Sequence, residues 1–249
     1  MVYTNSSLVS YTKLSPNHSG QRTHSIDRIT PHCVVGQLTA ENICGCFTSP
    51  SREASCNYGI GKDGKIALCV EEKNRSWCSS SSANDQRAVT IECASDLNHP
   101  YAMTTAVYNS LVKLCTDICK RNGKKKLLWL GDKNKTLNYS PKSDEMVLTV
   151  HRWFANKSCP GDWLYSRLGD LASKVTAALG GSSSGSAASA LYRVRKSWPD
   201  AKSQKGAFNN LDNAKKCVDS NAGYSVFDES GKVVYTGKQS GAGSSTGSF

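Results

Sequence analysis

The chain of 249 residues lacks any apolar run near the roughly 20 residues that a membrane-spanning helix needs. We therefore expect no transmembrane segment. The first residues, "MVYTNSSLVSYTKLSPNHSG", also lack the basic start and the apolar stretch of a secretory signal peptide. We expect synthesis in a cytoplasm without a signal peptide, and export only where another factor provides it.

Acidic residues are scarce beside basic ones. The chain has 20 Asp and Glu against 31 Lys and Arg, which gives a formal net charge of +11. This balance favours a polyanionic partner such as nucleic acid, an anionic membrane or an anionic cell-wall polymer. Plain solubility is the alternative, because the basic residues are spread along the chain. No basic-aromatic motif supports nucleic acid, so we do not expect that partner.

The cysteines do not suggest a disulfide framework. There are 11 of them, an odd number, in a chain that is neither short nor provided with a signal. Most lie in apolar surroundings, where a free thiol behaves as a small hydrophobic group. Cys44 and Cys46 have too few partners at suitable spacing for a metal site. We expect mostly reduced thiols, with Cys159 as a metal-binding exception.

Strand and helix patterns alternate along the first 180 residues. Strands are expected in "RITPHCVVGQ", "RAVTIECAS", "KLLWLG" and "MVLTV", and a hairpin in "CNYGIGKDGKIALCV", with its turn at Asp63-Gly64. Helices are expected in "AENICGCF", from Pro100 to just before Gly123, and from Asp162 to Leu179, whereas the first two dozen residues look irregular. The alternation predicts an α/β fold with a central mixed sheet flanked by helices.

Composition divides the chain into four parts. Residues 1–180 form the first domain, and the Gly/Ser-rich residues 181–190 are predicted to be a flexible linker. A strand, a helix and a hairpin in residues 191–237 predict a small α+β module. The polar residues 238–249 are predicted to be a disordered tail.

Three residues far apart in the sequence are candidates for a metal site. His32 lies in a predicted strand, and "HRWFANKSCPG" contains His151, Lys157 and Cys159. Imidazole nitrogens and a thiolate are typical zinc ligands, and three of them leave a fourth position for water. Cys159 must ionise to bind, and both zinc and Lys157 are expected to lower its pKa. By spacing alone, a core histidine and a structural Cys-Pro remain alternatives.

Four segments together resemble one enzyme family. "TPHCVVGQ", "SCNYGIGKDGKI", "RAVTIECASD" and "HRWFANKSCPGDWL" follow one another as in zinc-dependent N-acetylmuramoyl-L-alanine amidases. That group includes phage endolysins and shares its fold with peptidoglycan recognition proteins. The resemblance covers about residues 20–180.

The resemblance implies roles for particular residues. The zinc ligands would be His32, His151 and Cys159. Glu92 would be the general base on the water that zinc activates, Lys157 would stabilise the oxyanion, and Tyr58 would stabilise it further or position the substrate. Relatives differ in whether the carboxylate or the tyrosine transfers the proton, so the assignment between Glu92 and Tyr58 stays open. Many relatives have a histidine after the residue that matches Trp77, whereas this chain has Cys78. Cys78 could be a spare metal ligand or part of the pocket wall, but we favour neither role.

The resemblance also implies the reaction. The enzyme would hydrolyse the amide between the lactyl group of N-acetylmuramic acid and L-alanine in bacterial peptidoglycan. A basic, modular enzyme without a signal is typical of a phage endolysin, made in the host cytoplasm and released to the wall through holin-formed membrane holes. A bacterial autolysin, or a recognition protein that binds without cutting, is the alternative, and the Cys159 ligand favours an enzyme. We expect a monomer.

The C-terminal module fits the same setting. Its "GAF" and "NAKK" segments faintly resemble peptidoglycan-binding domains of the SPOR type. Several basic residues suit an anionic wall polymer: Arg193, Arg195, Lys196, Lys202 and Lys205. A tethered wall-binding module would raise the substrate concentration near the first domain. The alternative is a small folded module with no affinity for walls.

Overall fold

The computed structural model describes residues 3–180, 192–208, 211–228 and 230–237. The chain divides into two compact units, Met1–Ser186 and Ala187–Phe249, which are described separately below. The predicted linker and tail, residues 181–190 and 238–249, lie outside the described residues. Among the described residues, no helix is long and apolar enough to cross a membrane.

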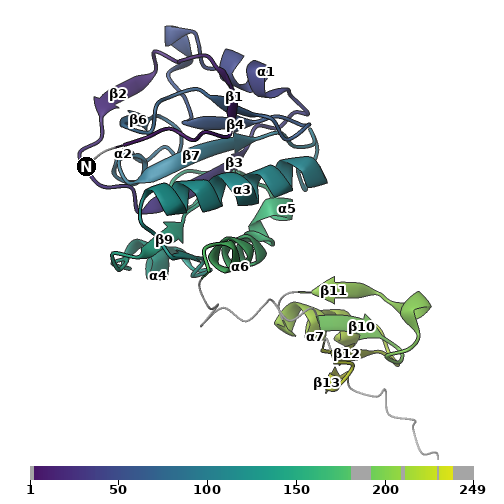
Figure 1. Cartoon of the computed structure of the whole chain (residues 1–249). Helices are drawn as coiled ribbons and strands as arrows, with labels where there is room; N and C mark the ends of the chain where they lie inside the picture. The colour runs from purple at the N-terminus through teal and green to yellow at the C-terminus, as the bar shows by residue number, and fades with distance from the viewer. Residues whose placement is uncertain (1–2, 181–191, 209–210, 229, 238–249) are drawn as a thin grey trace, which may run out of the picture. The chain divides into compact units, whose positions relative to one another are not determined.

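The first unit is built on a seven-stranded mixed sheet, as predicted (Figure 1). The strand order is β1-β5-β4-β7-β3-β9-β8, and only the β4–β5 pair is antiparallel. These strands are β1 (Val9–Thr12), β3 (Arg28–Cys33), β4 (Tyr58–Ile60), β5 (Ile66–Leu68), β7 (Ala88–Cys93), β8 (Lys126–Leu128) and β9 (Glu145–Leu148). A separate two-stranded sheet pairs β2 (His18–Gln21) with β6 (Asn74–Ser76).

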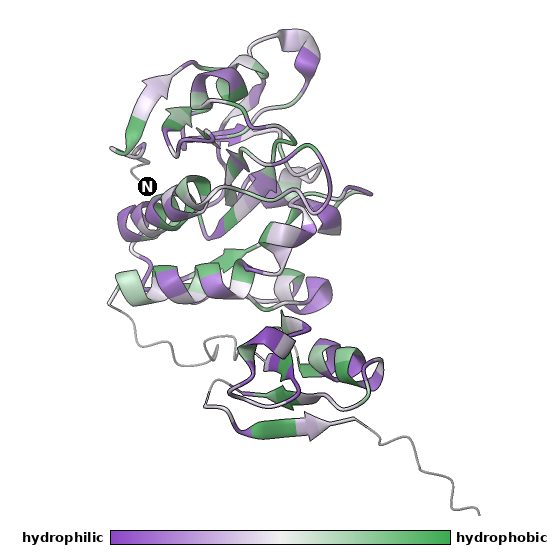
Figure 2. Ribbon diagram, turned by 90° about the vertical axis from the view of Figure 1, so that its right-hand side faces the viewer, coloured by the Kyte–Doolittle hydropathy of each residue, from purple (hydrophilic) through white to green (hydrophobic). Residues whose placement is uncertain are grey.

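Helices pack against this sheet. The long helix α3 (Thr105–Arg121) contacts β4, β7 and α6 (Leu168–Ala178), which itself covers β8. α1 (Ala40–Gly45) packs on β1, β4 and β5. The shorter helices are α2 (Ser82–Asp85), α4 (Lys133–Leu137) and α5 (Asp162–Tyr165), with 3-10 turns η1 (Pro50–Arg52) and η2 (His151–Trp153). Hydrophobic and hydrophilic residues alternate along the helices in Figure 2, as amphipathic packing requires.

Several boundaries differ from the sequence-based expectation. The first two dozen residues are not irregular, because they contain β1 and β2. α3 begins at Thr105 and not at Pro100, because the Thr104 hydroxyl accepts the N–H of Val107 as an N-cap. The predicted helix from Asp162 is two helices, since the chain leaves helical geometry at Arg167.

The expectation of reduced thiols is wrong at one place. Cys44 of α1 forms a disulfide with Cys69, which directly follows β5, across a Cα–Cα distance of 5.3 Å. The other nine cysteines are free, and several of them are buried core residues, as expected. The disulfide fixes α1 to the end of β5 and removes Cys44 from any metal site.

The second unit is the expected small α+β module. Its strands β10 (Tyr192–Arg195), β11 (Gly206–Phe208), β12 (Ser225–Phe227) and β13 (Val233–Thr236) form an antiparallel sheet in the order β11-β10-β12-β13. A 3-10 turn, η3 (Ala201–Ser203), lies between β10 and β11. Helix α7 (Leu211–Asp219) packs on the sheet over a small core of Val194, Ala214, Val218 and Val226.

Candidate metal centre and catalytic cavity

The site forms where parallel strands end side by side. In the β3–β7 register, His32 lies directly beside Glu92, so both side chains emerge on the same face of the sheet. β9 runs parallel to β3 on the other side and leads within three residues to His151. Binding sites of parallel sheets commonly lie at the carboxyl ends of the strands, and this one follows that rule.

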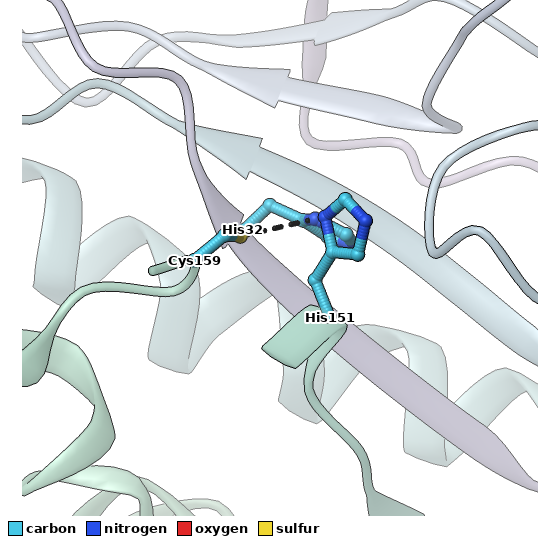
Figure 3. A group of neighbouring side chains, drawn as sticks. All are labelled: His32, His151 and Cys159. Atoms are coloured by element: carbon cyan, nitrogen blue, oxygen red, sulfur yellow. Dashed lines mark hydrogen bonds between the residues drawn. The ribbon is translucent and has the colours of Figure 1, made fainter. Parts of the chain in front are cut away.

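The three predicted ligands converge. One ligand atom from each of His32, His151 and Cys159 lies within 4.8 Å of the other two. The Cys159 Sγ is 3.2 Å from His32 Nδ1, and the two imidazole centroids are 5.1 Å apart. Figure 3 shows the three side chains pointing toward one another from β3, from the turn at His151 and from the loop that carries Cys159.

Backbone and side-chain bonds close the segment that supplies two of these ligands. The N–H of Arg152 donates to the carbonyl of Cys159 at 3.1 Å, which brings His151 and Cys159 to the same place. The Arg152 guanidinium donates to the Ser158 carbonyl at 2.5 Å and to Asp162 Oδ1 at 2.9 Å. Arg152 therefore fixes the loop from both its backbone and its side chain.

The chemistry of these side chains fits a zinc ion. Burial, and then the nearby His151, lowers the pKa of His32 well below its ordinary value, and burial followed by Lys157 lowers that of His151. Both rings are therefore neutral near pH 7 and have a lone pair to offer. The Nε2 of His32 is buried without a hydrogen-bond partner among the described residues. Two neutral imidazoles and one sulfur are a donor set typical of zinc.

The thiol of Cys159 behaves differently from the expectation. Burial, and then a hydrogen bond with Cys33, raises its pKa well above the ordinary value. In the metal-free chain burial outweighs any lowering by Lys157, whose charge also lowers the pKa of His151. A metal ion must therefore displace a proton from this sulfur, so metal binding releases that proton.

Glu92 is a half-buried carboxylate with one oxygen unused. Its Oε1 lies 4.0 Å from His32 Nδ1 and 3.9 Å from the Sγ of Cys78. Its Oε2 is buried and has no partner among the described residues. Burial raises the pKa of Glu92 to about 7, although Arg52 and the Cys78 thiol partly oppose the shift. A carboxylate with this pKa is suited to exchange protons near neutral pH.

A cavity of about 860 Å³ opens above these groups. His151, Cys159, Glu92 and Lys157 all line it, and Lys157 is exposed. Apolar residues form part of its wall: Val34, Val35, Leu38 and Phe47. Arginines also line it, at positions 52 and 75. The cavity thus joins the candidate metal ligands to a surface with both apolar and cationic parts.

Tyr58 does not line this cavity. Its side chain is fully buried, and its hydroxyl donates to Glu72 Oε1 at 2.6 Å while accepting the N–H of Ser6 at 2.9 Å. Arg121 pairs with the same Glu72. The structure therefore brings the five other predicted residues together and places Tyr58 in a separate buried polar network, where its hydroxyl cannot contact a substrate.

Two residues near the site were given no role by the sequence analysis. Cys78, favoured as neither ligand nor wall, does line the cavity, and it also groups with His32 and Glu92 as possible metal ligands. The Ser80 hydroxyl is hydrogen-bonded to His151 Nε2 at 2.9 Å. The buried Asp85 carboxylate fixes this loop by accepting the N–H groups of Cys78 and Ser79. Only the fold reveals these contacts, because the loop is a plain run of serines in sequence.

Comparison with known proteins places the chain in a family. The family model for N-acetylmuramoyl-L-alanine amidase matches residues 22–162, more than half of the chain. No match is found among curated proteins.

Several solved structures resemble the chain. A structure of PlyL is 16% identical, with a TM-score of 0.48, and the match covers 66% of this chain and 95% of that one. An AmpD derivative is 18% identical, with a TM-score of 0.47 and coverage of 68% and 98%. The Ph2119 endolysin from a Thermus scotoductus bacteriophage is 15% identical, with a TM-score of 0.42 and coverage of 65% and 89%.

Proposed function

The chain belongs to the N-acetylmuramoyl-L-alanine amidase family. We propose that it hydrolyses the amide between the lactyl group of N-acetylmuramic acid and the first L-alanine of peptidoglycan, with a zinc ion held by His32, His151 and Cys159. The observation that carries the proposal is the approach of two imidazoles and one thiol to within 4.8 Å of one another, at the edge of a cavity of about 860 Å³.

Zinc supplies the electrophilic part of the chemistry. When bound, it would polarise a carbonyl and lower the pKa of a water molecule far below its ordinary value, to about 7. The chain provides the ligands in a form ready to bind, since both rings are neutral near pH 7 and the His32 Nε2 has no competing partner among the described residues.

Glu92 is the proposed general base. Its free Oε2 accepts the proton of the attacking water and returns it to the leaving amine of L-alanine. Burial raises its pKa to about 7, which brings the group close to the value at which one residue both accepts and donates near neutral pH. Such a base contributes roughly 10²–10⁴-fold to the rate.

Lys157 is the proposed electrostatic partner of the oxyanion. It lines the cavity and is exposed, so its ammonium group is able to reach a bound substrate. A positioned donor at a developing oxyanion is worth about 2.7–4 kcal/mol in comparable sites. Tyr58 has no place in this mechanism, because its hydroxyl is buried with Glu72 and Ser6.

We propose that the enzyme acts at the bacterial cell wall as a phage or prophage endolysin. Release from the host cytoplasm through holin-formed holes, and binding of the second unit to an anionic wall polymer, belong to the same proposal. The second unit supports it with exposed or half-buried basic residues at Arg193, Arg195 and Lys196. A bacterial autolysin with the same chemistry is the alternative, and the origin of the gene distinguishes the two.

The test is digestion of purified walls by the zinc-loaded protein and by Cys159→Ser. The intact protein should release stem peptides with a free L-alanine amino terminus, identified by product mass, and should contain one zinc ion per chain. Cys159→Ser should retain its fold, lose most of its zinc and release almost no peptide. Peptide release that persists without bound metal would contradict the proposal.

A further inference from the structure

His32 belongs to a second group of possible metal ligands, which we call the second trio. One ligand atom from each of His32, Cys78 and Glu92 lies within 4.8 Å of the other two. The Oε1 of Glu92 is 4.0 Å from His32 Nδ1 and 3.9 Å from the Sγ of Cys78. The mechanism above uses Glu92 only as a base and gives Cys78 no role, so it leaves this grouping unexplained.

The fold holds the second trio in place from three segments. His32 and Glu92 are paired residues of the neighbouring strands β3 and β7. Cys78 lies two residues after β6, and its N–H donates to the buried Asp85 carboxylate at 3.0 Å. Side chains on such fixed supports are already close to the geometry that an ion needs.

Two polar atoms of the second trio are buried and lack a hydrogen-bond partner among the described residues: His32 Nε2 and Glu92 Oε2. His32 itself is 0% exposed. Within the same part of the chain, no Lys or Arg lies at ion-pair distance from Glu92. Buried polar atoms without partners are costly, and a cation bound by the carboxylate would remove that cost. Cys78 and Glu92 both line the cavity, so an ion from solvent is able to reach them.

The second trio is less tightly arranged than the three proposed zinc ligands. Zinc bonds of about 2.0–2.3 Å place the ligand atoms of a tetrahedral site roughly 3.3–3.7 Å apart. The distance of 3.2 Å between Cys159 Sγ and His32 Nδ1 is already close to that range. The distances of 4.0 and 3.9 Å from Glu92 Oε1 must shorten before an ion binds. We therefore expect the second trio to bind metal more weakly.

We propose that His32, Cys78 and Glu92 form a second, weaker position for a divalent metal ion that favours nitrogen and sulfur ligands, such as zinc. The Cys78 thiol loses its proton to solvent as the ion binds. A neutral imidazole has one nitrogen with a free lone pair, so His32 serves one ion at a time and the two positions exclude each other. An ion in the second position also occupies Glu92, the proposed base. Only this last consequence rests on the proposed function.

The experiment titrates the metal-free, full-length protein with Co²⁺ under anaerobic conditions. Cobalt replaces zinc as a probe, because a cysteine thiolate bound to it gives a charge-transfer absorption. Cys159→Ser disables the first position, and Cys159→Ser/Cys78→Ser disables both. The matched control is Cys159→Ser/Cys46→Ser, since Cys46 is a free, exposed cysteine that lines the same cavity but belongs to neither group. Circular dichroism establishes that each variant is folded.

Cys159→Ser, which is largely empty as purified, should bind one Co²⁺ per chain with thiolate absorption, at a higher free metal concentration than the wild type. The Cys46 control should keep this absorption. Cys159→Ser/Cys78→Ser should lose it, and its Kd for Co²⁺ should rise at least about 10-fold, because even the loss of a supporting contact costs a metal site 10–100-fold. Cys159→Ser/Glu92→Gln tests the same trio through another ligand, and its Kd should also rise at least about 10-fold.

Absence of thiolate absorption in Cys159→Ser, or its persistence in Cys159→Ser/Cys78→Ser, would overturn the second position. Failure of the proposed function gives a different result. A wild type that binds metal but leaves walls intact contradicts the proposed hydrolysis, whereas the cobalt titrations of the variants still decide whether the second trio binds metal.

Discussion

Two glutamates of the first unit, the buried Glu72 and the half-buried Glu92, have opposite surroundings. The Glu72 side chain is 1% exposed, and both its oxygens are used: Arg121 donates to Oε1 and Oε2, and Tyr58 donates to Oε1. The Glu92 side chain is 14% exposed. Within the described residues, its only ion-pair-distance neighbour is His32, which is neutral near pH 7, and its Oε2 has no partner.

The two glutamates therefore have different roles: Glu72 contributes to stability, whereas Glu92 is available for a reaction. A buried charge whose hydrogen-bonding capacity is filled is fixed by its partners, so the Glu72 network holds elements together. A buried carboxylate with free capacity has a perturbed pKa and stays available for chemistry. Tyr58 illustrates the first kind, since its hydroxyl is fully engaged with Glu72 and Ser6.

The largest expected effect is that of Glu92→Gln. The amide keeps the shape of the side chain but cannot accept a proton, so hydrolysis of walls should fall by roughly 10²–10⁴-fold. The melting temperature should stay the same or rise, because an unsatisfied buried carboxyl group is removed. The control Glu41→Gln, in the first turn of α1 and outside the cavity, should hydrolyse walls normally. Unchanged hydrolysis by Glu92→Gln would assign the proton transfer elsewhere.

The second test concerns Glu72, whose carboxylate oxygens are both hydrogen-bonded. Arg121→Met leaves Glu72 buried without its cation, and unfolding free energy should drop by about 3–5 kcal/mol, as when one partner of a buried pair is removed. Zinc stoichiometry of the protein that remains folded should be unchanged. Lys174→Met breaks an exposed helical pair and should cost no more than about 0.5 kcal/mol in urea unfolding. Equal losses of unfolding free energy in Arg121→Met and Lys174→Met would contradict a stabilising role for the buried Glu72 network.

Acidity provides a third test. Glu92 must be ionised to accept a proton, so kcat/KM should fall about tenfold per pH unit below its pKa. Burial raises that pKa to about 7 in the metal-free chain, and a bound cation lowers it, so the midpoint of the acid limb should lie at or below about 7. A pH–rate profile on a soluble muramyl peptide measures it. The residual activity of Glu92→Gln should lack this limb.

The smallest expected effect is at Ser80, which touches a ligand and not the substrate. With Nε2 of His151 engaged by the Ser80 hydroxyl, Nδ1 is the nitrogen left for a metal. Loss of such a supporting bond typically weakens metal affinity by 10–100-fold, and we expect the lower end for Ser80→Ala, because this serine is exposed. Chelator competition measures the zinc affinity. Ser82→Ala is the control, and an equal change in both variants would rule out a specific role.

Sequence patterns predicted the sheet because buried-strand runs, such as those of β3 and β7, are local signals. The candidate ligands came instead from the resemblance to the amidase family, which rests in part on the Lys-x-Cys-Pro-Gly segment. The roles of Tyr58 and Cys78 depended instead on which way a side chain points after folding. One residue of a strand faces the cavity and the next faces the core, and motif resemblance does not distinguish the two. The second trio of His32, Cys78 and Glu92 joins three separate segments of the chain, so no local pattern predicts it.

The disulfide between Cys44 and Cys69 makes the stability of the first unit depend on the redox conditions around it. It encloses a loop with a sequence separation of 25, and a crosslink of that span constrains the unfolded chain by about 3–4 kcal/mol in the entropic account. In a reducing compartment such a bond stays open, whereas outside the cell it closes. If the proposed function holds, the chain is made in a reducing cytoplasm and acts outside it. Its free energy of unfolding would then be higher at the cell wall than at the site of synthesis, with no change of sequence.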